Sequence, residues 1–236
     1  MHVKAHLDVD MVAVETTDRV SLMVDLTAPI GDAQKSRPGQ AVQVVLDRSG
    51  SMSGDRLRSA KESILKLLDR LAPQDSFGLV AFDDQALVIA PIRTMADHDL
   101  NALKKVIREL NTGGSTDLSA GYFMGLRELA RVNTNNGATL LLISDGHANA
   151  GIKDPNELHD VATKSATTKI TTSTIGIGDG YDENILESIA RGGGGQHRFA
   201  FTIDEAVGAI AAEVNDLLEK SAVNAVLRVT PVAGLA

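Results

Sequence analysis

The sequence predicts an α/β fold, in which helices flank a doubly wound, mostly parallel central sheet. Short runs rich in Val, Leu and Ile, which are typical of strands buried on both faces, recur along the chain. Between them lie segments with the apolar periodicity of amphipathic helices. This alternation indicates parallel strands joined by helical crossovers. A chain of 236 residues is long enough for one large domain of this kind with a small appendage.

The first predicted elements are two N-terminal strands, at residues 3–14 and 20–26, where apolar and polar side chains alternate. A linker that contains Gly, Pro, Lys and Arg follows them. The main domain then begins with the continuous apolar run 41–46, which has the length and composition of a buried strand. Leucines and an isoleucine on one face predict a helix over residues 55–71, which Pro73 ends.

The next predicted elements are a hairpin and two helices. Strand 76–82 is expected to pair with strand 86–89 across a polar turn at residues 83–85. A helix over about 97–110 follows, and a Gly-rich loop separates it from a helix that ends near residue 132. The first of these helices is expected to bury five apolar side chains, those of Leu100, Leu103, Val106, Ile107 and Leu110.

The last part of this region continues the same alternation of strand and helix. Its predicted elements are a fully apolar strand at 139–143, a helix at 156–168, a strand at 170–177, a helix at about 182–190, a short strand, and a helix at about 204–219. The glycines at 192–195 are expected to end the helix before the short strand. They do not match a phosphate-binding loop, because the run follows a helix and lacks the Lys-Ser/Thr that would follow.

Three segments of the chain are expected from this order. Residues 1–39 supply the N-terminal strands and linker, residues 40–220 form the α/β domain, and residues 221–236 contain a C-terminal strand. This last strand stands outside the alternation. We therefore expect it to pair with the N-terminal strands in a small β-layer, with the α/β domain inserted between the two halves, or to begin a β-rich extension.

Composition and charge exclude several classes of function. The formal net charge is −8 and no basic stripe is present, which argues against nucleic-acid binding. The absence of cysteine excludes disulfides, thiolate metal sites and thiol nucleophiles. The N-terminus lacks the apolar segment of a signal peptide, and no apolar run approaches the roughly 18 residues of a membrane-spanning helix. A cytoplasmic location is the expectation that follows.

The most informative motif directly follows the first buried strand. Asp47 ends this strand, and Ser49 and Ser51 follow it at steps of two residues. Their carboxylate and hydroxyl oxygens are hard ligands that suit Mg²⁺, Mn²⁺ or Ca²⁺. Open α/β sheets bind their ligands at the carboxyl ends of the strands, where this loop is placed. The motif therefore predicts a divalent cation held by oxygen atoms.

Two further loops place suitable oxygens at the same edge of the predicted sheet. Thr116 lies in a Gly-rich loop just before a helix, and Asp145 follows the second fully apolar strand. Asp47 and Asp145 would together neutralise the charge of a dication. The cation would remain electrophilic toward one more anionic oxygen.

Together the three loops resemble the metal-ion-dependent adhesion site (MIDAS) of the von Willebrand factor type A (VWA) domain. The first loop matches the family pattern D-x-S-x-S in full, Gly113 to Asp117 matches the Gly-rich loop with its Thr, and Ser144-Asp145-Gly146 matches the Asp after a central strand, with Ser where Thr is frequent. The resemblance covers about residues 40–220 and implies a Rossmann-like fold. It implies a metal site made by Asp47, Ser49, Ser51, Thr116 and Asp145.

The resemblance also implies the kind of partner. In the family, a Glu or Asp of a partner protein completes the metal shell, and direct contact of the Thr depends on whether the site is open or closed. That change is linked to displacement of the last helix, here about residues 204–219. Four residues are expected to border the site and to help select the partner: Arg48, Met52, Ser53 and His147.

Simpler interpretations exist for four of the five proposed ligands. Asp47 and Ser49 are residue types that cap helices, and a helix is predicted to begin near residue 55. Thr116 has the same alternative for the helix that follows it, whereas Asp117 is expected to be a cap or loop brace rather than a ligand. Asp145 alone would be an ordinary turn residue before a glycine. Capping does not account for all three loops together.

The leading functional hypothesis is a metal-dependent protein-binding module rather than an enzyme. One alternative is a Mg²⁺-dependent phosphatase or other hydrolase, in which the metal activates water. No Lys, Arg or His can be placed beside the ligands from the sequence, and the serine-hydrolase pattern G-x-S-x-G is absent. Another alternative is a subunit of an assembly with an AAA+ ATPase, as in chelatase complexes.

Overall fold

The computed structural model describes residues 2–7, 21–27, 39–132, 137–145, 148–178 and 183–201, together with Glu205, Gly208, Ala209, Ala212 and Glu213. Its contacts divide the chain into two compact units, Met1–Ser36 with Glu219–Ala236, and Arg37–Leu218. The strand predicted after residue 221 and the linker residues 28–38 lie outside the described part of the chain.

In the first unit, β1 (His2–Leu7) and β2 (Leu22–Thr27) form an antiparallel two-stranded sheet. Val3 lies opposite Leu26, and Ala5 lies opposite Val24, so these four apolar residues share one face. Val3 and Leu26 are both more than half exposed. The structure thus has a strand in each of the two runs where alternating apolar and polar residues predicted one. Residues 8–14 of the first run lie outside the described part of the chain. A sheet of two strands alone is marginally stable in water.

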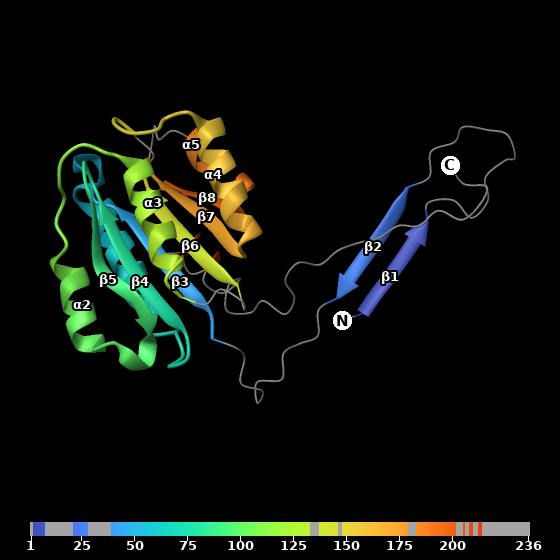
Figure 1. The fold of residues 1–236 in the computed structure, drawn as a ribbon, viewed down its shortest axis with the longest axis horizontal. Coiled ribbons are helices and arrows are strands. Elements are labelled where there is room, and N and C mark those ends of the chain that lie inside the picture. The colour runs from blue at the N-terminus through green and yellow to red at the C-terminus, as the bar shows by residue number, and fades with distance from the viewer. Residues whose placement is uncertain are drawn as a thin grey trace, which may run out of the picture. The chain divides into compact units, whose positions relative to one another are not determined.

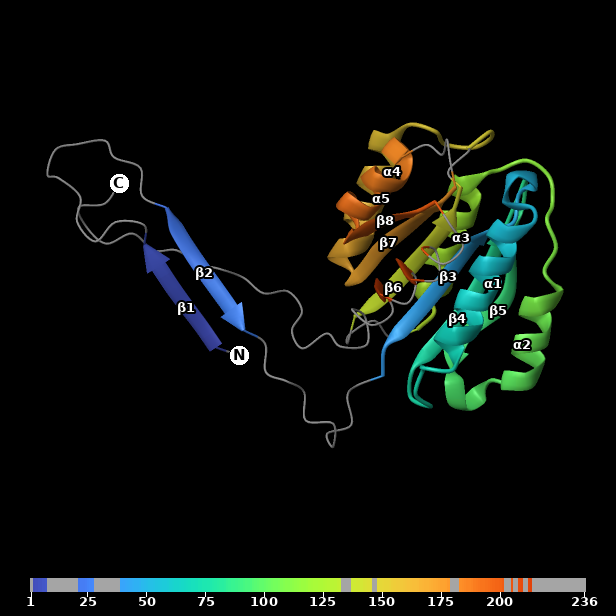
Figure 2. The same ribbon diagram turned by 180° about the vertical axis from the view of Figure 1, so that it is seen from behind.

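The second unit contains a six-stranded sheet with the strand order β5-β4-β3-β6-β7-β8 (Figures 1 and 2). Neighbouring strands are parallel except for β4 and β5, which are antiparallel. The predicted α/β class with a mostly parallel sheet is therefore confirmed. The strands are β3 (Ala41–Asp47), β4 (Ser76–Phe82), β5 (Ala86–Thr94), β6 (Ala138–Ser144), β7 (Ile170–Ile177) and β8 (Gly194–Ala200).

Helices cover both faces of this sheet. Figure 1 shows α3, α4 and α5 over one face, and Figure 2 shows α1 and α2 on the other side. None of the helices in the described residues is long and apolar enough to cross a membrane. The helices are α1 (Asp55–Leu68), α2 (Leu100–Glu109), α3 (Leu118–Leu129), α4 (Pro155–Thr167) and α5 (Glu183–Gly192), with short 3₁₀ turns at Gly50–Met52 and Met95–Asp97.

Two hydrophobic clusters, one on each side of the sheet, form the core. Along β3, Val44 and Leu46 pack toward the α1 side, and Val45 between them packs toward the α3 side. All three side chains are fully buried. Because successive side chains of a strand point to opposite faces, only a strand covered on both sides uses a continuous apolar run. Each such side chain stabilises the fold by roughly 1.5–3 kcal/mol.

The last described helical residues are anchored to the sheet by a buried carboxylate. Glu213 is 3% exposed, and Oε2 of Glu213 accepts a hydrogen bond of 3.0 Å from Nε of Arg198 on β8. Its other oxygen accepts a hydrogen bond from Ser173 on β7. This contact fixes the position at which the chain returns to the sheet after β8.

Two expectations need correction. Leu100 and Val106 of α2 are 37% and 41% exposed, although the sequence predicted that they would face inward. Helix α2 buries only a narrow stripe, Leu103 and Ile107, because it packs at the edge of the sheet near β5 (Figure 2). Strand β5 also runs five residues further than expected, with two register shifts against β4.

Candidate metal centre

The register of the parallel strands brings the candidate ligands to one edge of the sheet. Asp47 at the end of β3 pairs with Phe82 at the end of β4. On the other side of β3, Leu46 pairs with Ile143, so the chain leaves β6 at the same level. The loops that follow β3 and β6 are therefore adjacent at the carboxyl edge, as α/β sites require.

Asp47 is a fully buried carboxylate with defined partners for both oxygens. Oδ1 accepts a hydrogen bond of 2.8 Å from the backbone N–H of Ser49, and Oδ2 accepts one of 2.6 Å from Oγ of Ser144. Burial raises the pKa of Asp47 to about 6. Hydrogen bonds from Ser144 and Ser49 act in the opposite direction, and the charge of Asp145 raises the pKa further. Ionised Asp47 is therefore held in the folded domain at a cost in stability.

The two serines of the first loop point their hydroxyls toward one another. Oγ of Ser49 and Oγ of Ser51 are 3.0 Å apart, with Ser49 buried and Ser51 exposed. The N-cap of α1 is Gly54, and no side chain caps this helix. The alternative in which Asp47 or Ser49 merely caps the following helix is therefore wrong.

The loop that carries Thr116 is joined to the first loop through the backbone. The N–H of Gly50 donates to the carbonyl of Gly114 at 2.9 Å, and the N–H of Gly113 donates to the carbonyl of Arg48 at 2.7 Å. Thr116 is 1% exposed. The cap of α3 is Asp117, whose Oδ1 accepts from the N–H of Ala120 at 2.9 Å. The predicted role of Asp117 as a cap is confirmed, and the capping alternative for Thr116 is wrong.

Asp145 is 1% exposed and lies beside a cation. Its Oδ2 is 3.3 Å from Nη1 of Arg56, which also donates to the carbonyl of Ser51 at 3.1 Å. Arg56 is in the first turn of α1, so it links the first loop to the end of β6. Asp145 is therefore part of a buried electrostatic contact and is not simply a turn residue.

The four residues expected at the border of the site have different environments. Nη2 of Arg48 pairs with Oδ2 of Asp83 at 2.7 Å, so Arg48 joins the first loop to the end of β4. Met52 is fully buried in the core and offers no surface to a partner, which corrects that expectation. Ser53 is exposed, and His147 lies outside the described residues.

Comparison with known proteins agrees with the motif and the fold. The family profile of the von Willebrand factor type A domain matches residues 42–213. The chain belongs to this family. It is 30% identical over 174 residues to the uncharacterized protein sll0103 of Synechocystis, a match that covers 74% of this chain and 40% of that protein. The chain therefore spans less than half of that relative.

Solved structures share the fold at lower identity. The von Willebrand factor type A protein of Catenulispora acidiphila has a TM-score of 0.71 at 18% identity, over 92% of this chain and 50% of that one. Proximal thread matrix protein 1 from the mussel byssus, in a structure with a zinc-occupied MIDAS motif, has a TM-score of 0.57 at 20% identity. This second match covers 77% of our chain and 48% of the mussel protein.

Three residues of this VWA domain contribute to the site without having been predicted to do so. Ser144 was not among the predicted site residues, yet its hydroxyl donates to Oδ2 of Asp47 at 2.6 Å. Asp83 was interpreted as turn chemistry, and it does accept from the N–H of Gln85 at 3.0 Å, yet it also pairs with Arg48. Arg56 carries no signal in the sequence, because its contacts are with Asp145 and Gly178, which lie far from it along the chain.

The chemistry of the donor set fits a hard divalent cation. Among the described residues, no group of three or more His, Cys, Asp or Glu side chains is placed to hold a metal. The VWA loops instead combine two carboxylates with hydroxyls, which suits Mg²⁺ with several retained waters. The charge of Asp145 raises the pKa of Asp47, so a cation close to both carboxylates would stabilise their charged forms.

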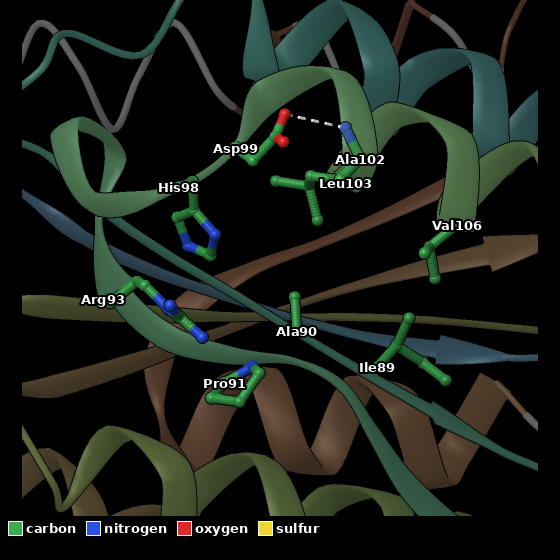
Figure 3. A pocket seen from close by; sticks show the side chains of 9 residues that line it. All are labelled: Ile89, Ala90, Pro91, Arg93, His98, Asp99, Ala102, Leu103 and Val106. Carbon is green, nitrogen blue, oxygen red and sulfur yellow. Dashed lines mark hydrogen bonds between the residues drawn. The ribbon is translucent and has the colours of Figure 1, made fainter.

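A pocket of about 230 Å³ between β5 and α2 is separate from this centre (Figure 3). Arg93 in its wall pairs with Phe77 near the start of β4, whereas Asp47 pairs with Phe82 at the end of that strand. His98, also in its wall, contacts the carbonyl of Phe77 through Nε2 at 3.0 Å. The pocket therefore lies toward the start of β4, away from the carboxyl edge of the sheet that carries the candidate ligands.

Proposed function

We propose that this VWA domain is a protein-binding module whose metal centre takes up an acidic side chain of a partner. Asp47, Ser49, Ser51, Thr116 and Asp145 would supply the oxygens for Mg²⁺, with Mn²⁺ or Ca²⁺ as other candidates. The bound ion would supply a Lewis-acidic position for a carboxylate. This mode of binding needs no covalent reaction, so we propose a binding protein rather than an enzyme.

The observation that carries the proposal is the buried carboxylate of Asp47, held by two hydrogen bonds beside a second buried carboxylate, Asp145. Burial of like charges is unfavourable unless a cation compensates them. The serine hydroxyls beside Asp47 add neutral oxygen donors on the same side. A dication would balance the two carboxylates and leave affinity for one more anionic oxygen.

Two further observations support this role. Proximal thread matrix protein 1, which shares the fold, has a MIDAS motif that holds zinc. In the present chain, backbone hydrogen bonds tie the first loop to the loop of Thr116, and the N–H groups of Asn149 and Ala150, after β6, donate to the carbonyl of Thr116. The Arg48–Asp83 pair also joins the first loop to the end of β4. A loop set fixed in this way is prepared to bind an ion without a large ordering cost.

Thermal unfolding tests the metal site directly. The wild-type domain and Asp47→Ala would each be unfolded in EDTA and across a titration of Mg²⁺ or Mn²⁺. At one hundred times the dissociation constant, the metal stabilises a native protein by about 2.7 kcal/mol. We expect the midpoint to rise with metal for wild type only. Equal curves in EDTA and metal for wild type would contradict the proposal.

Binding of an acidic ligand tests the second half of the proposal. An immobilised peptide with one Glu or Asp in a neutral sequence should retain the metal-loaded wild type and lose it in EDTA. The same peptide with Gln or Asn is the control. Hydrolysis of common phosphoesters that depends on Mg²⁺ and on Asp47 would instead favour the phosphatase alternative, and capture of an AAA+ ATPase would favour the assembly alternative.

A further inference from the structure

Arg56 contacts two segments of the candidate metal centre. Its Nη1 lies 3.3 Å from Oδ2 of Asp145 and donates to the carbonyl of Ser51 at 3.1 Å. The side chain of Arg56 is 33% exposed, and that of Asp145 is 1% exposed. The guanidinium therefore covers a carboxylate that has almost no contact with water.

The backbone at the end of β7 is shaped for this guanidinium. Gly178 has a φ of +93°, and a Cβ at this position would lie 2.5 Å from Nε and 2.6 Å from Cζ of Arg56. Any side chain here would collide with the arginine and would also be strained at this φ. Arg56 is thus packed against Gly178 as well as bonded to Ser51 and Asp145, so it contacts the segments that follow β3, β6 and β7.

A neighbouring arginine shows what an ordinary surface pair looks like in the same helix. Arg58, two residues further along α1, pairs with Asp55, and the two side chains are 60% and 62% exposed. Pairs of this kind contribute little and are screened by salt. Arg56 differs because its carboxylate partner is buried and belongs to the candidate metal shell.

Building on the proposed function, we propose that Arg56 is a resident cation that sets the metal affinity of the site. In the metal-free domain it neutralises Asp145, so an incoming dication must compete with it for the same carboxylate. With the ion bound, the two carboxylates balance the metal and Arg56 adds one positive charge. A single partner carboxylate then restores neutrality, so the same residue weakens binding of the metal alone and favours an acidic partner.

Calorimetric titration with MgCl₂ or MnCl₂ alone tests this role in the full chain. Removing the charge with Arg56→Gln should tighten metal binding by about tenfold or more, and the gain should shrink as the salt concentration rises. Arg56→Lys keeps the charge and should remain close to wild type. Arg58→Gln, on the same helix but paired with the exposed Asp55 rather than with a candidate ligand, is the matched control and should bind metal like wild type.

The outcomes separate this inference from the proposed function. If wild type binds metal and Arg56→Gln binds it equally or more weakly, the competition is overturned while the metal site stands. If neither protein binds any metal, both proposals fail. Unfolding in EDTA reports whether each variant is folded. If Arg56→Lys binds metal as tightly as Arg56→Gln is expected to, the packing of Arg56 and not its charge sets the metal affinity.

Discussion

The hydroxyl of Ser144 donates a hydrogen bond of 2.6 Å to Oδ2 of Asp47, a residue 97 positions earlier in the chain. The bond joins the end of β6 to the end of β3, and both side chains are fully buried. Oδ1 accepts a hydrogen bond from the N–H of Ser49, so bonds to both oxygens fix the orientation of the carboxylate. Asp47 is therefore oriented by a residue of β6, which lies outside the motif of Asp47, Ser49 and Ser51.

Replacing Ser144 with Ala should destabilise the metal-free domain and weaken metal binding. A buried hydrogen bond to a charged group contributes about 1.5–3 kcal/mol, and its loss leaves Oδ2 of Asp47 without this donor. Chemical denaturation in EDTA measures the first effect, and calorimetry with Mn²⁺ measures the second. Ser53→Ala, at an exposed position of the same edge, is the control. Unchanged metal affinity in Ser144→Ala would mean that orientation of Asp47 does not matter.

Asp47→Asn should stabilise the metal-free domain at neutral pH while abolishing stabilisation by metal. The pKa of Asp47 is raised from 3.8 to about 6, so the folded state binds the proton more tightly than the unfolded state. The stability from this group is fully present below about pH 4 and is lost as the pH rises through 6, by about 3 kcal/mol in total. Asparagine stays neutral, so its advantage should be large at pH 7.5 and small at pH 4.

The same titration predicts how metal binding depends on pH. A proton on Asp47 competes with the cation, so the metal affinity of wild type should fall as the pH drops below about 6. Calorimetry at several pH values measures this directly. An affinity that stays constant between pH 7 and pH 5 would show that Asp47 does not ligate the metal in its ionised form.

The sequence predicts the buried strands and the positions of the loops between them well, because each is marked by a short run of neighbouring residues. The bounds of β4 and β7 agree with the prediction, since each is a compact run rich in apolar and β-branched residues. The contact from Ser144 to Asp47 depends instead on the pairing of β3 with β6, which no local pattern encodes. The packing of Arg56 likewise depends on Gly178, which follows β7 and lies more than a hundred residues away in the sequence.

Gly178→Ala should displace Arg56 and thereby change the metal site. The new Cβ would meet the guanidinium, in addition to the strain of a φ of +93°, which costs about 1–3 kcal/mol. Gly54→Ala is a matched control, because Gly54 has a φ of +76° and nothing within 4 Å of its Cβ position. We expect tighter metal binding in Gly178→Ala only. Equal destabilisation and equal metal affinity in both variants would show that the arginine is not held by this glycine.

Gly113→Ala should disrupt the loop that carries Thr116, whereas Gly114→Ala should be tolerated. A Cβ at residue 113 would lie 1.7 Å from Oδ2 of Asp83, the atom that pairs with Arg48. At residue 114, the nearest atom would be 3.8 Å away, which is ordinary contact. The first variant must move either the Asp83 carboxylate, which pairs with Arg48, or the loop itself. The loop is held by the bonds from the N–H of Gly113 to the carbonyl of Arg48 and from the N–H of Asp117 to the backbone carbonyl of Asp83.

The measurement is the unfolding midpoint of both variants in EDTA and in saturating Mn²⁺. We expect Gly113→Ala to lose stability in EDTA and most of the metal-dependent rise, and Gly114→Ala to stay within about 0.5 kcal/mol of wild type in both. If Gly113→Ala unfolds earlier but keeps the full rise with metal, the loop is structural and Thr116 does not ligate the ion. A full loss of the rise in Gly114→Ala would instead show that the loop must move to bind metal, because its static packing leaves room for that methyl group.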